Sequence, residues 1–149
     1  MSNVKKLSRR AALANLGAVG SATRKGRKKQ KVMLLLTYTP RDDINLDEYH
    51  DWLRSTDNPF FNSRPSVKHY ANWRVLEAKL GPRSFTHFDL LEVRGLDGYD
   101  KVFADPKIVA FAKDWVRRWG KVPDPELKDQ SVNYQVYLCE QVAAPRRDS

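Results

Sequence analysis

The chain has 149 residues, of which 41% are apolar and 30% charged, a composition typical of one globular domain with its own core. Its single cysteine, Cys139, excludes an intramolecular disulfide framework and any cysteine-rich zinc module. No apolar run approaches the ~20 residues that a membrane span needs, so we expect no membrane partner.

The formal net charge of +9 is concentrated at the N-terminus. Residues 1–31 contain ten of the 27 basic side chains and none of the 18 acidic ones, so the rest of the chain is nearly neutral. The high isoelectric point therefore belongs to an extension and not to the domain, and nucleic acid is an unlikely partner. We divide the chain into a basic extension over 1–30, a domain over 31–143 and a C-terminal tail over 144–149.

Three interpretations of the extension stay open. Residues 8–13 resemble the twin-arginine export motif, and small residues at 20–22 would suit cleavage, which would place the protein in the periplasm. Against export, Ala12 stands where that motif usually has an aromatic residue, and a basic run follows at 24–29. The segment would otherwise be a basic arm that attracts polyanions, or a short helix with a solvated tail. We favour the last interpretation and a cytoplasmic location.

The first half of the domain predicts a strand and a helix. Residues 31–39 form an apolar run without helix caps, as in a buried central strand. Asn45 can cap a helix, and Pro59 disfavours helical geometry at the residue before it, so we expect this helix to end near Asp57. The apolar stripe of the helix comprises Leu46, Tyr49, Trp52, Leu53 and Thr56.

The second half predicts a hairpin, a helix and a final strand. Residues 67–78 and 84–93 flank a loop with Gly81 and Pro82, which is typical of a β-hairpin. The clearest helix begins at Pro106, with Asp105 as its cap and Gly120 to end it. We expect a shorter helical turn capped by Asp97 before it, and a last strand over 131–142.

The resulting order, βαββαβ, predicts an α+β, ferredoxin-like fold: one antiparallel four-stranded sheet with two helices on one face. The first strand is apolar on both of its faces, so the face without helices needs a cover. We expect a homodimer in which two sheets close on each other as an α+β barrel. The alternative is a monomer whose N-terminal segment covers that face.

A family resemblance is carried by residues 49–61, Tyr-His-Asp-Trp-Leu-Arg-Ser-Thr-Asp-Asn-Pro-Phe-Phe, and by residues 69–75, His-Tyr-Ala-Asn-Trp-Arg-Val. Over residues 31–143 the chain resembles the REDY/HapK-like group of dimeric α+β-barrel proteins, which are related to the EthD-like group. The resemblance implies a small-molecule role in aromatic, pyrrole or polyketide metabolism, usually without a metal or organic cofactor. EthD-like relatives often carry His-x-Pro where this chain has Asp57-Asn58-Pro59, which moves attention to Asp57.

The sequence lacks the motifs of most catalytic classes. There is no P-loop, no GxGxxG, no HExxH and no Cys/His ligand spacing. His87 and Asp89 share a strand face and could join a three-ligand metal site, but we expect no metal and no cofactor. Cys139 lies in a hydrophobic strand, where a thiol is usually inert.

General acid/base chemistry is the enzyme class that remains. His50 lies on the flank of the first helix, and Asp57 follows two turns later, about 10 Å away. That separation suits two groups acting on one ligand. His87, which Asp89 can orient, is a second candidate base. We therefore assign His50, Asp57 and His87 as catalytic candidates, although each also has a structural interpretation, which for an isolated histidine such as His50 is the commoner one.

Substrate-binding candidates come from two strands. Tyr70, Asn72 and Arg74 share a face and would offer a phenol, an amide and a cation to a phenolate or enolate. Trp73 and Tyr137 could stack on an aromatic substrate.

Two functions remain from different classes: a cofactor-independent lyase, cyclase or isomerase acting on a small aromatic or phenolic substrate, and a ligand-binding or accessory dimer without turnover. A polyanion-binding protein that docks through its tail is a third, weaker alternative.

Overall fold

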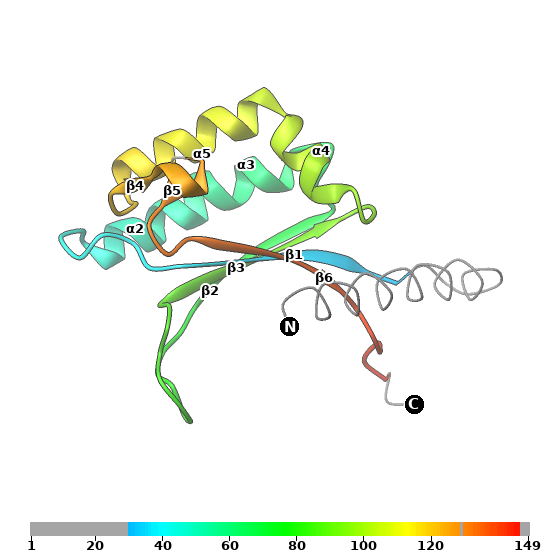
Figure 1. The fold of residues 1–149 in the computed structure, drawn as a ribbon, viewed down its shortest axis with the longest axis horizontal. Helices are drawn as coiled ribbons and strands as arrows, with labels where there is room; N and C mark the ends of the chain where they lie inside the picture. Colours follow the sequence, from blue (N-terminus) through cyan, green and yellow to red (C-terminus); the bar gives the residue numbers. More distant parts are fainter. Residues whose placement is uncertain (1–29, 129, 147–149) are drawn as a thin grey trace, which may run out of the picture. The chain divides into compact units, whose positions relative to one another are not determined.

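The structure, a computed structural model, describes residues 30–128 and 130–146, and residues 31–149 form one compact unit. Helices lie along one face of a four-stranded sheet (Figure 1). No helix in the described part of the chain is long and apolar enough to cross a membrane. The elements are β1 (Val32–Tyr38), α2 (Leu46–Trp52), the π-helix η1 (Leu53–Asp57), α3 (Asn58–Asn62), β2 (His69–Arg74), β3 (His87–Val93), α4 (Gly98–Ala104), α5 (Pro106–Arg118), β4 (Pro123–Asp124), the 3-10 helix η2 (Pro125–Leu127), β5 (Gln130–Ser131) and β6 (Gln135–Glu140).

The sheet has the strand order β2-β3-β1-β6, and every neighbouring pair is antiparallel. With the helices between β1 and β2 and between β3 and β6, this is the predicted ferredoxin-like βαββαβ arrangement, which is confirmed. The two-residue strands β4 and β5 form a separate small sheet after α5.

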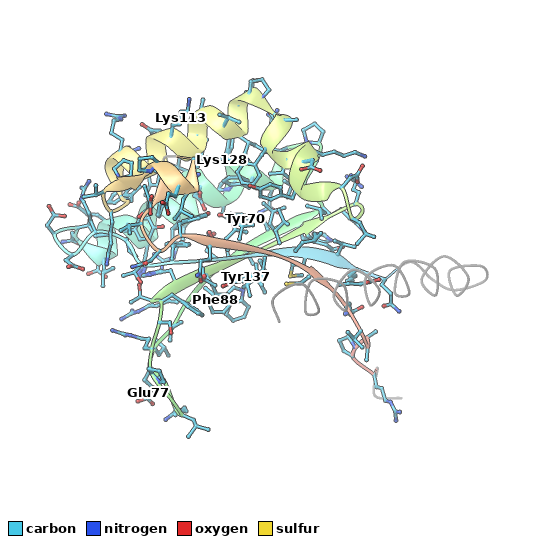
Figure 2. All side chains as sticks on the ribbon, in the orientation of Figure 1. Tyr70, Glu77, Phe88, Lys113, Lys128 and Tyr137 are labelled. Atoms are coloured by element: carbon cyan, nitrogen blue, oxygen red, sulfur yellow. The ribbon has the colours of Figure 1, made fainter. Side chains whose placement is uncertain are left out.

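The two faces of the sheet differ in what covers them. On the helix side, Leu34, Leu36 and Leu91 are almost fully buried against α3, α4 and α5. Figure 2 shows Tyr70 on this side, and Phe88 and Tyr137 on the opposite side. We call the opposite side the open face. The register assigns to it the apolar side chains of Met33, Leu35, Ala71, Trp73, Phe88, Leu90 and Tyr137.

The first helix does not end near Asp57, and that prediction is wrong. The chain stays helical through Pro59 to Asn62, because residues 53–57 adopt π-helical geometry. The proline ring would clash with a carbonyl group of the preceding turn in a regular α-helix. The wider π turn, in which the N–H of Asn58 donates to the oxygen of Leu53, relieves that conflict.

The second helical region agrees with the prediction. Asp105 caps α5 by accepting a hydrogen bond from the N–H of Lys107, and Pro106 occupies the first helical position. The shorter helix α4 follows Asp97 as predicted, but the prediction that Asp97 caps it is wrong, because the Asp97 side chain makes no capping hydrogen bond. Asp105 also pairs with Arg64, which ties the start of α5 to the chain after α3.

The predicted strands are longer than the observed ones. Beyond β2 and β3, one further backbone hydrogen bond joins Val75 to Thr86, and the rest of the hairpin leads away from the helices (Figure 1). We call residues 75–86 the arm. The last strand begins at Gln135 and not at 131, because Asn133 adopts a left-handed conformation with φ of 66° and breaks the extended chain.

Two asparagines cover the outer edge of β2. The side chain of Asn62 accepts a hydrogen bond from the N–H of Tyr70 at 2.9 Å and donates to its carbonyl oxygen at 3.0 Å. Asn58 donates to the same carbonyl oxygen at 3.1 Å. An edge strand otherwise presents unpaired backbone groups to solvent. Asn58 and Asn62 are four residues apart and therefore lie on the same side of α3, where their hydrogen bonds hold the helix against β2.

We expect Asn62→Ala to lower the free energy of unfolding by about 1–2 kcal/mol, because it leaves the Tyr70 N–H without its side-chain acceptor and removes one of the two side-chain donors to the Tyr70 carbonyl oxygen. Urea denaturation measures this difference. Lys113→Ala, on the exposed surface of α5, is the matched control and changes little. Equal stability of the two variants would contradict this role of Asn62.

Candidate functional site

A pocket of about 510 Å³ opens between the first helix and the end of β2. We call it the outer pocket. It is large enough for a small organic molecule. Its lining combines imidazole, guanidinium, amide and apolar groups: His50, Leu53, Arg54, Asn58, Ala71, Asn72, Trp73, Arg74 and His87.

Two histidines meet in this pocket. The Nε2 atoms of His50 and His87 are 2.9 Å apart, so one ring must donate the hydrogen and the other must accept it. The Nδ1 atom of His87 lies 2.8 Å from the hydroxyl of Thr86. If His87 donates from Nδ1 to Thr86, its Nε2 accepts from His50. The Nδ1 atom of His50, which has no hydrogen-bond partner among the described residues, then carries a free lone pair.

The pKa values of both imidazoles lie below the ordinary histidine value, which favours their neutral forms at pH 7. Burial, together with the charge of Arg74 and the charge that His50 carries when protonated, lowers the pKa of His87 to about 4. Burial, together with the positive charges of Arg74 and Arg54, also lowers the pKa of His50. A neutral imidazole is a proton acceptor, so the pair can serve as a general base over a wide pH range.

A second cluster lies behind the outer pocket. Asp57, at the end of η1, and Asp89, in β3, are only 3% and 4% exposed. The hydroxyl of Tyr70 lies 2.7 Å from Oδ2 of Asp57 and 3.0 Å from Oδ2 of Asp89. Nδ2 of Asn72 donates to both carboxyl groups at 2.9 Å. We call these four residues the aspartate cluster.

Counting hydrogens shows what this geometry requires. Tyr70 has one hydroxyl hydrogen, yet its oxygen is within hydrogen-bond distance of two carboxyl groups. Both contacts are satisfied when one carboxyl group is protonated and donates to Tyr70, while Tyr70 donates to the other. Two ionised carboxylates this deeply buried would repel each other without a cation to compensate.

The electrostatics agree with one shared proton. Burial raises the pKa of Asp57 to about 6, although the hydrogen bonds from Tyr70 and Asn72 oppose the rise. Burial and the charge of Asp57 raise the pKa of Asp89 to about 8. The pair therefore holds one proton near pH 7.

A series of hydrogen bonds leads to Oδ1 of Asp89 and stabilises it. The indole N–H of Trp115 donates to the hydroxyl of Tyr49, which donates to the hydroxyl of Tyr38 at 3.1 Å. Tyr38 in turn donates to Oδ1 of Asp89 at 3.3 Å. Burial raises the pKa of both tyrosines well above the ordinary value, so they remain donors. The chain connects α5, α2, β1 and β3 through polar contacts.

The structure places the predicted site residues in the outer pocket, in the aspartate cluster and on the open face of the sheet. His50, His87, Trp73 and Arg74 line the outer pocket. Asn72 separates the outer pocket from the aspartate cluster.

The other candidates lie elsewhere. Asp57 and Tyr70 belong to the cluster and do not line the outer pocket, which differs from the expected cavity beside His50, Asp57 and Arg74. The π turn explains the difference, because its extra residue turns Asp57 from the flank that carries His50 towards the sheet.

Tyr137 lies on β6, across the sheet from β2, and is 46% exposed on the open face. It does not line the outer pocket. Cys139 is a free thiol on the same strand. No group of three metal-binding side chains occurs within residues 30–128 and 130–146.

Sequence reasoning missed the main role of Asp89 and the donors Tyr38 and Tyr49. One signal was available: Asp89 is the only acid among the inward positions of the strand His87, Asp89, Leu91 and Val93. A carboxyl group in such a row must find buried partners. Its expected contact with His87 does not form, since Asp89 bonds to Tyr38, Tyr70 and Asn72 instead.

Comparison with known proteins identifies the family. A family model described as "REDY-like protein HapK" matches residues 32–126. The chain belongs to the REDY-like HapK family. The suspected family membership is thus confirmed, and the match covers the outer pocket and the aspartate cluster. No curated protein matches the chain.

Solved structures resemble this HapK-family chain in fold. An EthD family protein from Bacillus halodurans superimposes with a TM-score of 0.55 at 12% identity, covering 75% of this chain and 99% of the other. A dimeric ferredoxin-like protein of unknown function from Thermobifida fusca gives a TM-score of 0.50 at 12% identity, covering 76% and 93%. At this identity the likeness establishes the ferredoxin-like fold alone.

We expect the free energy of unfolding to fall as the pH rises from about 6.5 to about 8, above the range in which the lowered pKa of His87 gives the opposite pH dependence. The carboxyl groups have raised pKa values only when folded, so the folded state binds more protons than the unfolded state over this range. Asp89→Asn mimics the protonated acid and should remove this decline. Urea denaturation at a series of pH values measures it.

Asp57→Asn is the matched control for this measurement. It leaves Asp89 without a neighbouring negative charge, so it should lower the pKa of Asp89 and shift the remaining decline to lower pH. The same pH dependence in Asp89→Asn as in the unmodified protein would contradict the shared proton.

Proposed function

We propose that this protein is a cofactor-independent enzyme that performs general acid/base chemistry on a small aromatic or phenolic substrate in the outer pocket. The observation that carries the proposal is the neutral His50–His87 pair beside Arg74. A neutral imidazole accepts a proton from a carbon or hydroxyl acid, and a fixed guanidinium stabilises the oxyanion that develops. Lyase, isomerase and cyclase reactions all contain this step.

The roles of the two histidines differ in this proposal. His50 is half-buried and its Nδ1 is the free acceptor, so we assign it as the base. His87 is 2% exposed, and in the tautomer that donates from Nδ1 to Thr86 its Nε2 accepts a hydrogen bond from His50. His87 thus orients His50 and stabilises the imidazolium that forms, as a positioning residue.

The apolar walls suit an aromatic substrate. Trp73 is 53% exposed at the pocket and stacks with Phe88, with ring planes 2° apart and centroids separated by 5.9 Å. An aromatic ring could lie on its free surface. Leu53 and Ala71 provide further apolar lining. In this proposal Tyr70 and Asn72 hold the inner wall of the pocket in place through their hydrogen bonds to the carboxyl groups. Asp57 has no direct contact with the substrate.

The catalytic proposal is tested with phenylpyruvate, whose conversion from enol to ketone requires proton transfer and is followed by ultraviolet absorbance. We expect the protein to accelerate this step and His50→Ala to lower the rate by about 100-fold or more. The rate should fall at acidic pH, below the ordinary pKa of histidine, because protonation removes the base and the pKa of His50 is lowered.

His69→Ala is the matched control, since the chain has three histidines and His69 lies exposed on β2 outside the outer pocket. It should leave the rate unchanged. Binding of phenylpyruvate without any acceleration would contradict catalysis and favour the alternative function, a ligand-binding dimer.

We further propose that two copies pair through the open face. Its apolar side chains include Leu35, Leu90 and the Trp73–Phe88 stack, which no described segment covers. The similar structure from Thermobifida fusca is described as dimeric.

Light scattering of the unmodified protein should give twice the chain mass of 17.2 kDa. Leu90→Lys should give a folded monomer, because it places a charge in the centre of the apolar face. Lys113→Glu on α5 changes charge away from this face and should leave the dimer intact. A monomeric unmodified protein would contradict the pairing.

A further inference from the structure

The polar groups that line the outer pocket are not equally free to bind a ligand. Nδ2 of Asn72 is occupied by two carboxyl groups, and its oxygen accepts from Asn58. Nδ2 of Asn58 donates to that oxygen and to the carbonyl oxygen of Tyr70. Both amides are therefore held by the protein itself. The guanidinium groups of Arg74 and Arg54 remain as donors for a ligand, whereas His50 offers only its acceptor Nδ1.

Arg74 has no ion-pair partner among residues 30–128 and 130–146. The nearby acids of the hairpin are already paired, Glu77 with Lys79 and Glu92 with Lys68. The predicted structural alternative, an ion pair of Arg74 across the hairpin, does not occur. A guanidinium at a pocket wall presents a planar pair of donors that matches a carboxylate.

The charges of the side chains that line the outer pocket favour an anion. No acidic residue lines the outer pocket. The second guanidinium, Arg54, pairs with Asp51 at 3.0 Å, but both side chains are about three-quarters exposed, so the pair is weak. The histidines have lowered pKa values, so the positive charge of the pocket comes from its guanidinium groups. An anionic ligand would meet one unpaired guanidinium, and a cationic ligand would meet only repulsion.

The position of Arg74 also limits where the rest of the ligand lies. Arg74 and Trp73 are consecutive residues at the end of β2, and both line the pocket. Opposite Arg74 in the register stands His87, the partner of His50. Because Trp73, His50 and His87 line the same pocket, a ring attached to a carboxylate on Arg74 can reach the indole and the imidazole pair.

We infer that the outer pocket selects aromatic carboxylates, with the carboxylate bound by Arg74 and the ring lying against Trp73. This inference rests on the proposed function, because it names the substrate class of the same site. A volume of about 510 Å³ is sufficient for one or two fused rings with short substituents. Arg74 is then the specificity-determining residue, and His50 remains the base.

Calorimetric titration with three naphthalene derivatives of nearly equal shape tests the inference. We expect 2-naphthoate to bind at least tenfold more tightly than neutral 2-naphthamide, and the cation 2-naphthylmethylammonium not to bind. Arg74→Met should abolish the preference for 2-naphthoate and leave the affinity for 2-naphthamide unchanged. Arg74→Lys should retain part of the preference, since it keeps the charge and loses the planar pair of donors.

Arg83→Met is the matched control, because it removes an exposed arginine of the arm that does not line the outer pocket. It should leave the preference for 2-naphthoate intact. Equal affinities for acid and amide, or an unchanged preference in Arg74→Met, would overturn the inference.

Failure of the carboxylate selection can be distinguished from failure of the proposed catalysis. If 2-naphthoate is preferred through Arg74 but phenylpyruvate is not turned over, the pocket is an anion-selective binding site and catalysis fails. If the methyl ester of phenylpyruvate is turned over as well as the acid, catalysis stands and the selection of carboxylates fails.

Discussion

Two carboxyl groups buried without a cation can coexist only by sharing a proton, and the centre of this fold is organised around that constraint. Asp57 comes from the first helical region and Asp89 from β3, while Tyr70 and Asn72 of β2 bridge them. One proton satisfies every contact in this group. The cluster thus orients the helical region against two strands, which apolar packing alone would leave free to slide.

The same cluster determines the character of the outer pocket. Asn72 directs its amide hydrogens inward to the carboxyl groups, so it acts as a wall between two electrostatic environments. On the inner side of Asn72 lie the two carboxyl groups, which carry one negative charge and share one proton. In front of it lie a neutral imidazole pair and an unpaired guanidinium, Arg74. This separation keeps the acids from neutralising Arg74, which therefore remains available to an anion.

Part of the site could be predicted because strand periodicity is local information. The alternation of side chains along β2 correctly grouped Tyr70, Asn72 and Arg74 on one face. The contact between His50 and His87 could not be predicted, since it depends on how a helix and a strand 37 residues apart are aligned. The position of Asp57 was also hidden, because a regular helix and a π turn have the same sequence pattern but direct the residue differently.

Hydrophobic periodicity, caps and turn residues by themselves determined the order βαββαβ and hence the ferredoxin-like fold, because these signals act between residues close in sequence. Side-chain chemistry and strand alternation also identified five of the nine residues that line the outer pocket. Only the tertiary structure decided which of those residues meet. The antiparallel register brought Asp89 opposite Asn72, and the continuation of the first helix through Pro59 brought Asp57 to them. Contacts of this kind arise from long-range packing, which no local pattern encodes.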